Sequence, residues 1–150
     1  ADAIARRIIH ELDMVGLLAV EMFVTKSGKV LVNEIAPRPH NSGHQTIEAN
    51  ITSQYEQHLR AILNLPLGDT DLLMPSAMVN LLGEPDHSGV AKYEGFAEVI
   101  NLPGVHVHLY GKLFTKPFRK MGHVTIVDAN VKRLKKTATF VKETLKVVAA

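Results

Sequence analysis

Two glutamates in neighbouring strand-like segments are the first residues of this sequence that suggest chemistry. Residues 17–24 and 30–35 are rich in strand-forming residues and flank the turn Lys26-Ser27-Gly28-Lys29, a pattern that predicts a β-hairpin. With a loop of two or four residues, Glu21 lies directly opposite Glu34, with the Cβ atoms about 5 Å apart on one face. A loop of three residues would instead place the two side chains on opposite faces.

Two carboxylates at that separation repel each other and need a compensating cation, a shared proton or an arginine. A divalent metal is a natural solution, because Mg²⁺ typically uses one or two carboxylates together with substrate phosphates. Glu21 and Glu34 are therefore candidate magnesium ligands, and the neighbouring Asn33 could add an amide oxygen or contact a phosphate. The alternative is a pair of glutamates on a solvated sheet face.

A proline-flanked loop with several polar side chains follows the second strand segment. It reads Ala36-Pro37-Arg38-Pro39-His40-Asn41-Ser42-Gly43-His44, and loops at strand ends commonly carry functional residues. Arg38 could clamp a carboxylate or a phosphate, and His40 could move protons near neutral pH or orient a small anion. In the alternative interpretation, Asn41 and Ser42 are ordinary turn formers and His40 is a polar surface residue.

The two parts of the chain differ in charge. Residues 1–83 carry six Lys and Arg against nine Asp and Glu, whereas residues 84–150 carry eleven against six. This asymmetry suggests a cation site in the first part and an anionic partner in the second, although two solvated surfaces would give the same pattern. A turn in the second part gathers basic residues that could clamp a phosphate: Lys112, Lys116, Arg119, Lys120 and His123.

The elements that must position these residues follow from apolar spacing and turn residues. Helices are expected over 2–14, 53–63, 131–148 and, as a short one, 93–101, and further strands over 77–82, 105–110 and 123–127. Ser53 followed by Glu56 is a capping-box pattern for the helix 53–63. We expect an α/β fold, α+β in finer terms, with a boundary near residue 84 that separates parts 1–83 and 84–150.

Composition excludes several classes of protein. The 150 residues are 46% hydrophobic and contain no cysteine, so a globular core is expected, and disulfides and thiolate zinc sites are excluded. No apolar run is long enough to span a membrane. Nucleic-acid binding is disfavoured because aromatic residues make up only 5% and offer few stacking platforms. We expect a cytoplasmic protein without a membrane partner.

The sequence also resembles a known enzyme family. The run GLLAVEMFVTKSGKVLVNEIAPRPHNSGHQTIEA resembles the end of the ATP-grasp domain of carboxyaminoimidazole ribonucleotide synthetases, also called phosphoribosylaminoimidazole carboxylase ATPase subunits. The likeness continues in SQYEQHLRAILNLPLG, PSAMVNLLGE, GVHVHLYGK and RKMGHVTIVD. It implies the second half of an ATP-grasp domain followed by a small β-rich domain closed by a helix. The implied reaction of the parent enzyme joins bicarbonate to aminoimidazole ribonucleotide in purine biosynthesis and converts ATP to ADP and phosphate.

The resemblance assigns roles to individual residues. It implies that Glu21 and Glu34 bind the Mg²⁺ that bridges the ATP phosphates, and that Asn33 and Glu34 bind ATP. It implies catalytic and substrate-binding roles in the loop and a grip on the ribonucleotide phosphate in the basic turn. The loop residues concerned are Arg38, His40 and Asn41, and the turn residues are Lys112, Arg119 and Lys120.

The resemblance also implies partners. A complete family member has a further N-terminal part with lysines that hold the ATP phosphates, so we expect this chain to be inactive alone and the parent enzyme to be a homodimer. The nearest rival is the formate-dependent glycinamide ribonucleotide transformylase, which shares the Pro-Arg-Pro-His run. A rival of another class is a non-catalytic nucleotide-binding or assembly fragment.

Overall fold

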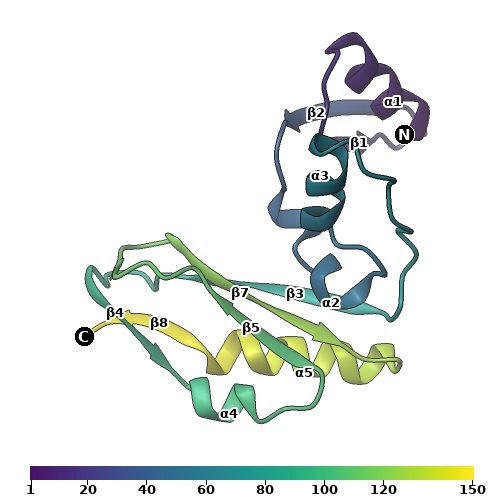
Figure 1. The fold of residues 1–150 in the computed structure, drawn as a ribbon. Coiled ribbons are helices and arrows are strands. Elements are labelled where there is room, and N and C mark those ends of the chain that lie inside the picture. The colour runs from purple at the N-terminus through teal and green to yellow at the C-terminus, as the bar shows by residue number, and fades with distance from the viewer. The chain divides into compact units, whose positions relative to one another are not determined.

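The computed structural model describes all residues 1–150, and the chain folds into two compact units (Figure 1). The first unit comprises Ala1–Ile47 and Ile51–Asp71, and the second comprises Glu48–Asn50 and Leu72–Ala150. This division differs from the boundary expected near residue 84. The reason is that the strand before residue 84 pairs with a strand about forty residues later and so belongs to the second unit.

The first unit is built from helices around one hairpin. Its elements are α1 (Asp2–Glu11), β1 (Ala19–Val24), β2 (Val30–Ala36), the 3-10 helix η1 (Asn41–Gly43), the start of α2 (Thr46–Ala49) and α3 (Gln54–Ile62). The hydroxyl of Ser53 accepts a hydrogen bond from the backbone N–H of Glu56 at 3.2 Å, which confirms the expected N-terminal cap of α3.

The hairpin of β1 and β2 closes with a three-residue loop. The backbone N–H of Thr25 donates to the carbonyl of Lys29 at 2.9 Å, which leaves Lys26, Ser27 and Gly28 in the loop. Gly28 has a φ of 82°, a left-handed conformation that suits the last position of such a loop. This loop length alone would put the two glutamates of the hairpin on opposite faces.

A β-bulge restores the register that brings the glutamates together. From the loop to Met22, which pairs with Val32, the register is regular, but one step further Glu21 pairs with Glu34. Asn33 is thus the extra residue of the bulge, which makes two residues of β2 oppose one residue of β1. The prediction that Glu21 faces Glu34 is confirmed, although the loop has the length for which we expected the opposite result.

The second unit contains two antiparallel three-stranded sheets. One has the order β3-β7-β5 and the other β6-β4-β8, and α5 packs against β3 and β7 (Figure 1). The elements are β3 (Ser76–Leu82), β4 (Gly89–Glu94), α4 (Phe96–Ile100), β5 (Val105–Leu109), β6 (Phe114–Thr115), β7 (Lys120–Val127), α5 (Val131–Thr144) and β8 (Lys146–Ala149).

The hydrophobic core lies in the second unit. Its buried members come from β3, α4, β7, α5, β8 and the residue between α5 and β8, and they are Leu81, Val99, Met121, Val124, Ile126, Leu134, Val141, Leu145 and Val147. Mixed helices and sheets of this kind confirm the expected α+β fold. No helix combines the length and the apolar character needed to cross a membrane.

Two expected helices have different bounds. The helix expected over 93–101 is instead the end of β4 followed by α4, and Gly95 separates them with a φ of 73°. The helix expected over 131–148 ends at Thr144, because the following residues form β8 and pair with β4. Val147 in β8 is 1% exposed, so core packing favours the strand over a longer helix.

Candidate functional site

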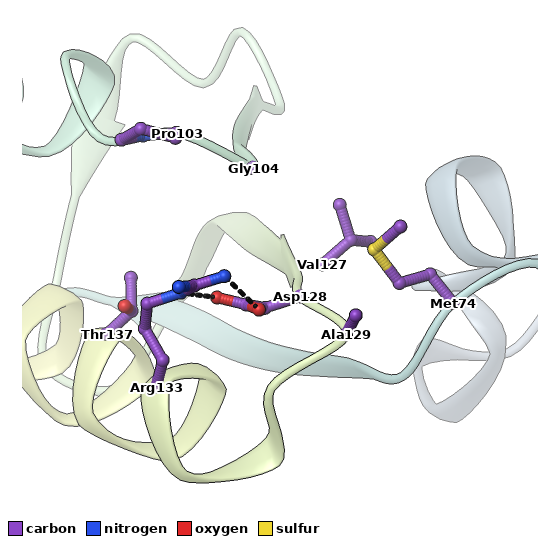
Figure 2. Close-up of a pocket in the computed structure, with 8 residues that line it drawn as sticks. All are labelled: Met74, Pro103, Gly104, Val127, Asp128, Ala129, Arg133 and Thr137. Atoms are coloured by element: carbon purple, nitrogen blue, oxygen red, sulfur yellow. Dashed lines mark hydrogen bonds and ion pairs between the residues drawn. The ribbon is translucent and has the colours of Figure 1, made fainter.

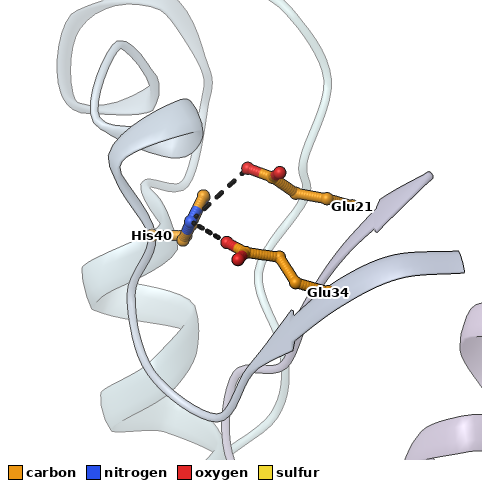
Figure 3. A group of neighbouring side chains, drawn as sticks. All are labelled: Glu21, Glu34 and His40. Carbon is orange, nitrogen blue, oxygen red and sulfur yellow. Dashed lines mark ion pairs between the residues drawn. The ribbon is translucent and has the colours of Figure 1, made fainter. Parts of the chain in front are cut away.

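Glu21, Glu34 and His40 form one side-chain cluster in the first unit (Figure 3). His40 Nε2 lies 3.6 Å from Glu21 Oε1 and 3.6 Å from Glu34 Oε1. The three candidate ligand atoms all lie within 4.8 Å of one another. The strands supply the two carboxylates, and the loop after β2 brings the imidazole to them.

The bulge adds a third polar group to the hairpin. Asn33 Nδ2 lies 3.4 Å from Glu21 Oε2 and donates a long hydrogen bond to it. An unbulged strand with this loop would pair Asn33 with Glu21 and turn Glu34 to the other face. The irregularity therefore lets both residues stand beside the same glutamate.

The cluster suits a divalent cation. Glu21 and Glu34 remain 41% and 58% exposed, and His40 is the only basic side chain that forms an ion pair with either of them. No lysine or arginine compensates the two carboxylates, so their repulsion favours a bound cation. Two carboxylate groups and an open side suit Mg²⁺, which keeps water and phosphate among its ligands.

The other residues predicted in the loop lie beside the cluster. Arg38 is exposed, and its Nη1 donates to the carbonyl of Pro39 at 3.1 Å. Asn41 begins η1, for which His40 is the N-cap residue. His40 Nδ1 lies 2.9 Å from the hydroxyl of Ser42, so Nε2 is the ring nitrogen that faces the glutamates.

Gln54 is a site residue that the sequence did not suggest. Its side-chain amide is hydrogen-bonded to both the backbone N–H and the backbone carbonyl of His40. It also lies 2.8 Å from His44 Nδ1, which Tyr55 contacts through its hydroxyl at 2.7 Å. Burial raises the pKa of the Tyr55 hydroxyl, which keeps the group protonated. In the sequence, a glutamine at the start of a helix looks like an ordinary surface residue. The only sequence signal for its role is the neighbouring loop, whose Gly43, His40 and His44 could pack around a buried polar side chain.

The predicted basic turn lies in the second unit. Lys112 Nζ donates to the carbonyl of Lys120 at 2.5 Å and lies 5.6 Å from the centre of the Tyr110 ring. Arg119 Nη1 donates to the carbonyl of Phe114 at 2.8 Å. Lys112, Arg119 and Lys120 are therefore held close together, although the predicted turn also contains the short strand β6 between Lys112 and Arg119.

His123, which we grouped with the basic turn, is buried. It is 2% exposed, its Nδ1 lies 3.0 Å from the Tyr110 hydroxyl, and its ring stacks on that of His108 at 4.5 Å. His108 Nε2 lies 2.7 Å from Glu48 Oε1. No acid lies near His108 in the chain, and α2 supplies Glu48 from sixty residues away.

A cavity of about 530 Å³ in the second unit contains none of the predicted site residues (Figure 2). Arg133 forms a two-point ion pair with Asp128 at this cavity, with Nη2 2.7 Å from Oδ1. Hydrogen bonding from Arg133, and then from the backbone of Asn130, lowers the pKa of Asp128. The pair is satisfied within the β7–α5 turn, so we assign it a structural role.

Comparison with known proteins identifies matches along most of the chain. The family model of the ATP-grasp domain matches residues 1–55. The family model of the phosphoribosylaminoimidazole carboxylase C-terminal domain matches residues 76–137. The N5-carboxyaminoimidazole ribonucleotide synthase of Bacillus subtilis (strain 168) is 52% identical over 124 residues, which cover 83% of this chain and 31% of that protein. The chain spans about a third of the length of the curated relatives it matches.

Solved structures agree with these matches. N5-carboxyaminoimidazole ribonucleotide synthetase from Thermotoga maritima superposes with a TM-score of 0.93 at 54% identity, over 99% of this chain and 41% of that one. The N5-carboxyaminoimidazole synthase of Aspergillus clavatus, solved with ADP and 5-aminoimidazole ribonucleotide, gives a TM-score of 0.82 at 32% identity. That match covers 95% of this chain and 38% of the other.

Proposed function

The chain belongs to the family of N5-carboxyaminoimidazole ribonucleotide synthases, and we propose that it is part of an enzyme that carboxylates aminoimidazole ribonucleotide. The enzyme uses ATP and bicarbonate and serves purine biosynthesis. One observation carries the proposal: two strand carboxylates and an imidazole converge within 4.8 Å in the part that matches the ATP-grasp domain. Such a cluster suits the metal-assisted binding of nucleotide phosphates.

In this proposal the hairpin forms the metal and nucleotide site. Glu21 and Glu34 would hold Mg²⁺, which supplies positive charge to neutralise the phosphates of ATP. Asn33, held beside Glu21 by the bulge, and Glu34 would contribute to ATP binding. The rigid pairing of β1 with β2 fixes these groups before the ligand arrives, so little reorganisation is required.

The loop and the basic turn would bind the reacting groups. The Arg38 guanidinium suits bicarbonate or a phosphorylated intermediate, since its donors match planar anions. Asn41 and His40 would orient the anion and the imidazole substrate, and His40 can move a proton at Nε2. Lys112, Arg119 and Lys120 would bind the ribonucleotide phosphate as a cationic clamp.

The remaining features of the proposal concern the whole enzyme. We propose that this chain needs the other two thirds of a family member for activity, and that the complete enzyme acts in the cytoplasm as a homodimer. Membership of the family favours bicarbonate over the formate used by the rival transformylase. For the isolated chain we propose the third alternative, a non-catalytic nucleotide-binding or assembly fragment.

The test is phosphate release from ATP by a protein of full family length that contains this chain. With aminoimidazole ribonucleotide present, bicarbonate should stimulate release and formate should not. Stimulation by formate, or equal release without either anion, would refute the proposal. Calorimetry with MgADP on the 150-residue chain separates a residual nucleotide site, which gives a saturable heat of binding, from none.

A further inference from the structure

We propose that Gln54 is the positioning residue of His40 and holds its imidazole against the two glutamates. The inference rests on the proposed function and deepens it, because it names the group that fixes the loop side of that site. Gln54 contacts neither glutamate in the structure. It acts on the site only through the backbone of His40.

The side-chain amide of Gln54 grips His40 at two points. The backbone N–H of His40 donates to Gln54 Oε1 at 2.9 Å, and Gln54 Nε2 donates to the carbonyl of His40 at 2.9 Å. A backbone N–H can only donate and a carbonyl can only accept, so these bonds fix which end of the amide is oxygen. The Gln54 side chain thereby satisfies both backbone hydrogen-bonding groups of His40, as a neighbouring β-strand would.

The same amide extends the grip to a second histidine. Gln54 Nε2 lies 2.8 Å from His44 Nδ1, and the amide nitrogen can only donate. His44 Nδ1 therefore accepts, and its ring proton lies on Nε2. Tyr55, which follows Gln54 in α3, stacks its ring on His44 with the centroids 5.6 Å apart. The first turn of α3 thus binds both ends of the segment from His40 to His44.

Burial and loop packing support a specific role for this glutamine. Gln54 is 8% exposed, whereas glutamine at a helix start is usually solvated. Its backbone N–H donates to Thr46 Oγ1 at 2.9 Å, and that hydroxyl donates to the carbonyl of Gly43 at 2.6 Å. The loop is therefore hydrogen-bonded to the Gln54 side chain at His40 and His44 and to the Gln54 backbone at Thr46.

Gly43 leaves the space that the amide occupies. A Cβ atom at Gly43 would lie 2.7 Å from Gln54 Oε1 and 2.9 Å from Gln54 Cδ, which is shorter than any ordinary contact. The backbone of Gly43 is not in the left-handed region, so an alanine here acts on the amide and not through backbone strain. Gly43→Ala is thus a way to displace Gln54 without changing its chemistry.

Gln57, one turn along α3, provides a matched control. Its Nε2 donates to the carbonyl of Gly68 at 2.7 Å, and its Oε1 accepts from the N–H of Gly68 at 2.8 Å. This is the same two-point grip from the same helix on a different loop. Gln57→Leu should cost similar stability but leave the segment that carries His40 in place.

The first experiment uses proton NMR on the 150-residue chain. Nuclear Overhauser effects between the His40 ring and the γ-methylene protons of Glu21 and Glu34 should be present in the wild type and in Gln57→Leu. They should be lost in Gln54→Leu and weakened in Gly43→Ala. Wild-type intensities in both of these variants, or an equal loss in Gln57→Leu, would overturn the proposal.

The second experiment measures carboxylation by the protein of full family length. A displacement of His40 by about 1 Å should lower kcat in Gln54→Leu by 10- to 100-fold and leave the KM for ATP within about twofold of the wild-type value. Gln54→Glu keeps the acceptor for the His40 N–H but loses the donor to the His40 carbonyl. The kcat of this variant should therefore lie between those of the wild type and Gln54→Leu. A kcat in Gln57→Leu as low as that in Gln54→Leu would count against positioning.

The two experiments separate this inference from the proposed function. A wild-type protein without carboxylation activity would refute the function, whereas the Overhauser comparison would still decide whether Gln54 holds His40.

Discussion

Glu34→Gln should have opposite effects on stability with and without magnesium. Without metal, the substitution removes the repulsion between Glu34 and Glu21. Unit charges at the 4.8 Å limit of this cluster repel by about 0.9 kcal/mol in water and by about 3.5 kcal/mol at an effective dielectric constant of 20. Because the two side chains are 41% and 58% exposed, the lower value applies. We expect Glu34→Gln to stabilise the metal-free chain by about 1 kcal/mol.

With magnesium, the order of stabilities should reverse. A cation that binds only the folded state, and is present at a concentration of about 100 times its dissociation constant, stabilises that state by about 2.7 kcal/mol. The wild type should gain this amount, whereas Glu34→Gln, which has lost one of two anionic ligands, should gain much less. The wild type would then be the more stable protein by more than 1 kcal/mol.

The assay is thermal unfolding over a MgCl₂ series at pH 8, where an ordinary imidazole is neutral. Sodium chloride keeps the ionic strength constant, because added salt also screens the repulsion. Glu143→Gln, which removes an exposed carboxylate from α5, controls for net charge. Equal magnesium-induced shifts of Tm in the wild type and Glu34→Gln would refute the metal assignment. A Tm for metal-free Glu34→Gln below that of the wild type would refute the calculated repulsion.

Three further predictions concern single contacts that stabilise the fold. Asp128→Asn should lower Tm at neutral pH, because the hydrogen bond from Arg133 holds the pKa of Asp128 below its usual value of 3.8. The difference in Tm between wild type and variant should vanish as pH falls below 3.8 and through the lowered pKa. A difference in Tm that persists to the acid end of a pH series of melts would contradict this. Gly95→Ala puts a Cβ 2.2 Å from the carbonyl of Thr144 at a φ of 73° and should cost about 3 kcal/mol in urea unfolding, whereas a loss below about 1 kcal/mol would contradict the clash. Ser53→Ala should lower the free energy of unfolding by about 1 kcal/mol in the same assay, and Ser53→Asp should keep the wild-type value.

The candidate carboxylates could be predicted from the sequence, but the route by which they meet could not. Richness in strand-forming residues and the turn residues located both strands and paired Glu21 with Glu34. The loop proved to have three residues, and only the bulge at Asn33 made the pairing hold. A bulge depends on how two strands fit locally, and an asparagine before a glutamate carries no signal for it.

The elements missed in the second unit depend on contacts between distant residues. Residues 146–148 continue the pattern of the helix expected over 131–148, yet they belong to β8 and pair with β4. The burial of Val147 in the core outweighs the local propensity of these residues for helix. Glu48 and His108 similarly meet across sixty residues. No local pattern contains this information, whereas the cap of α3 at Ser53 lies within one turn and was predictable.

The pairing of β4 with β8 has a consequence for how the protein is made. Tyr93 pairs with Val147, so the residues that complete this sheet are more than fifty positions apart. During synthesis β4 is made before β8, so its apolar side chains remain exposed until its partner strand is complete. Segments with exposed apolar side chains are prone to aggregation and are candidates for chaperone binding. The second unit should therefore acquire protease resistance only after residue 149 has emerged.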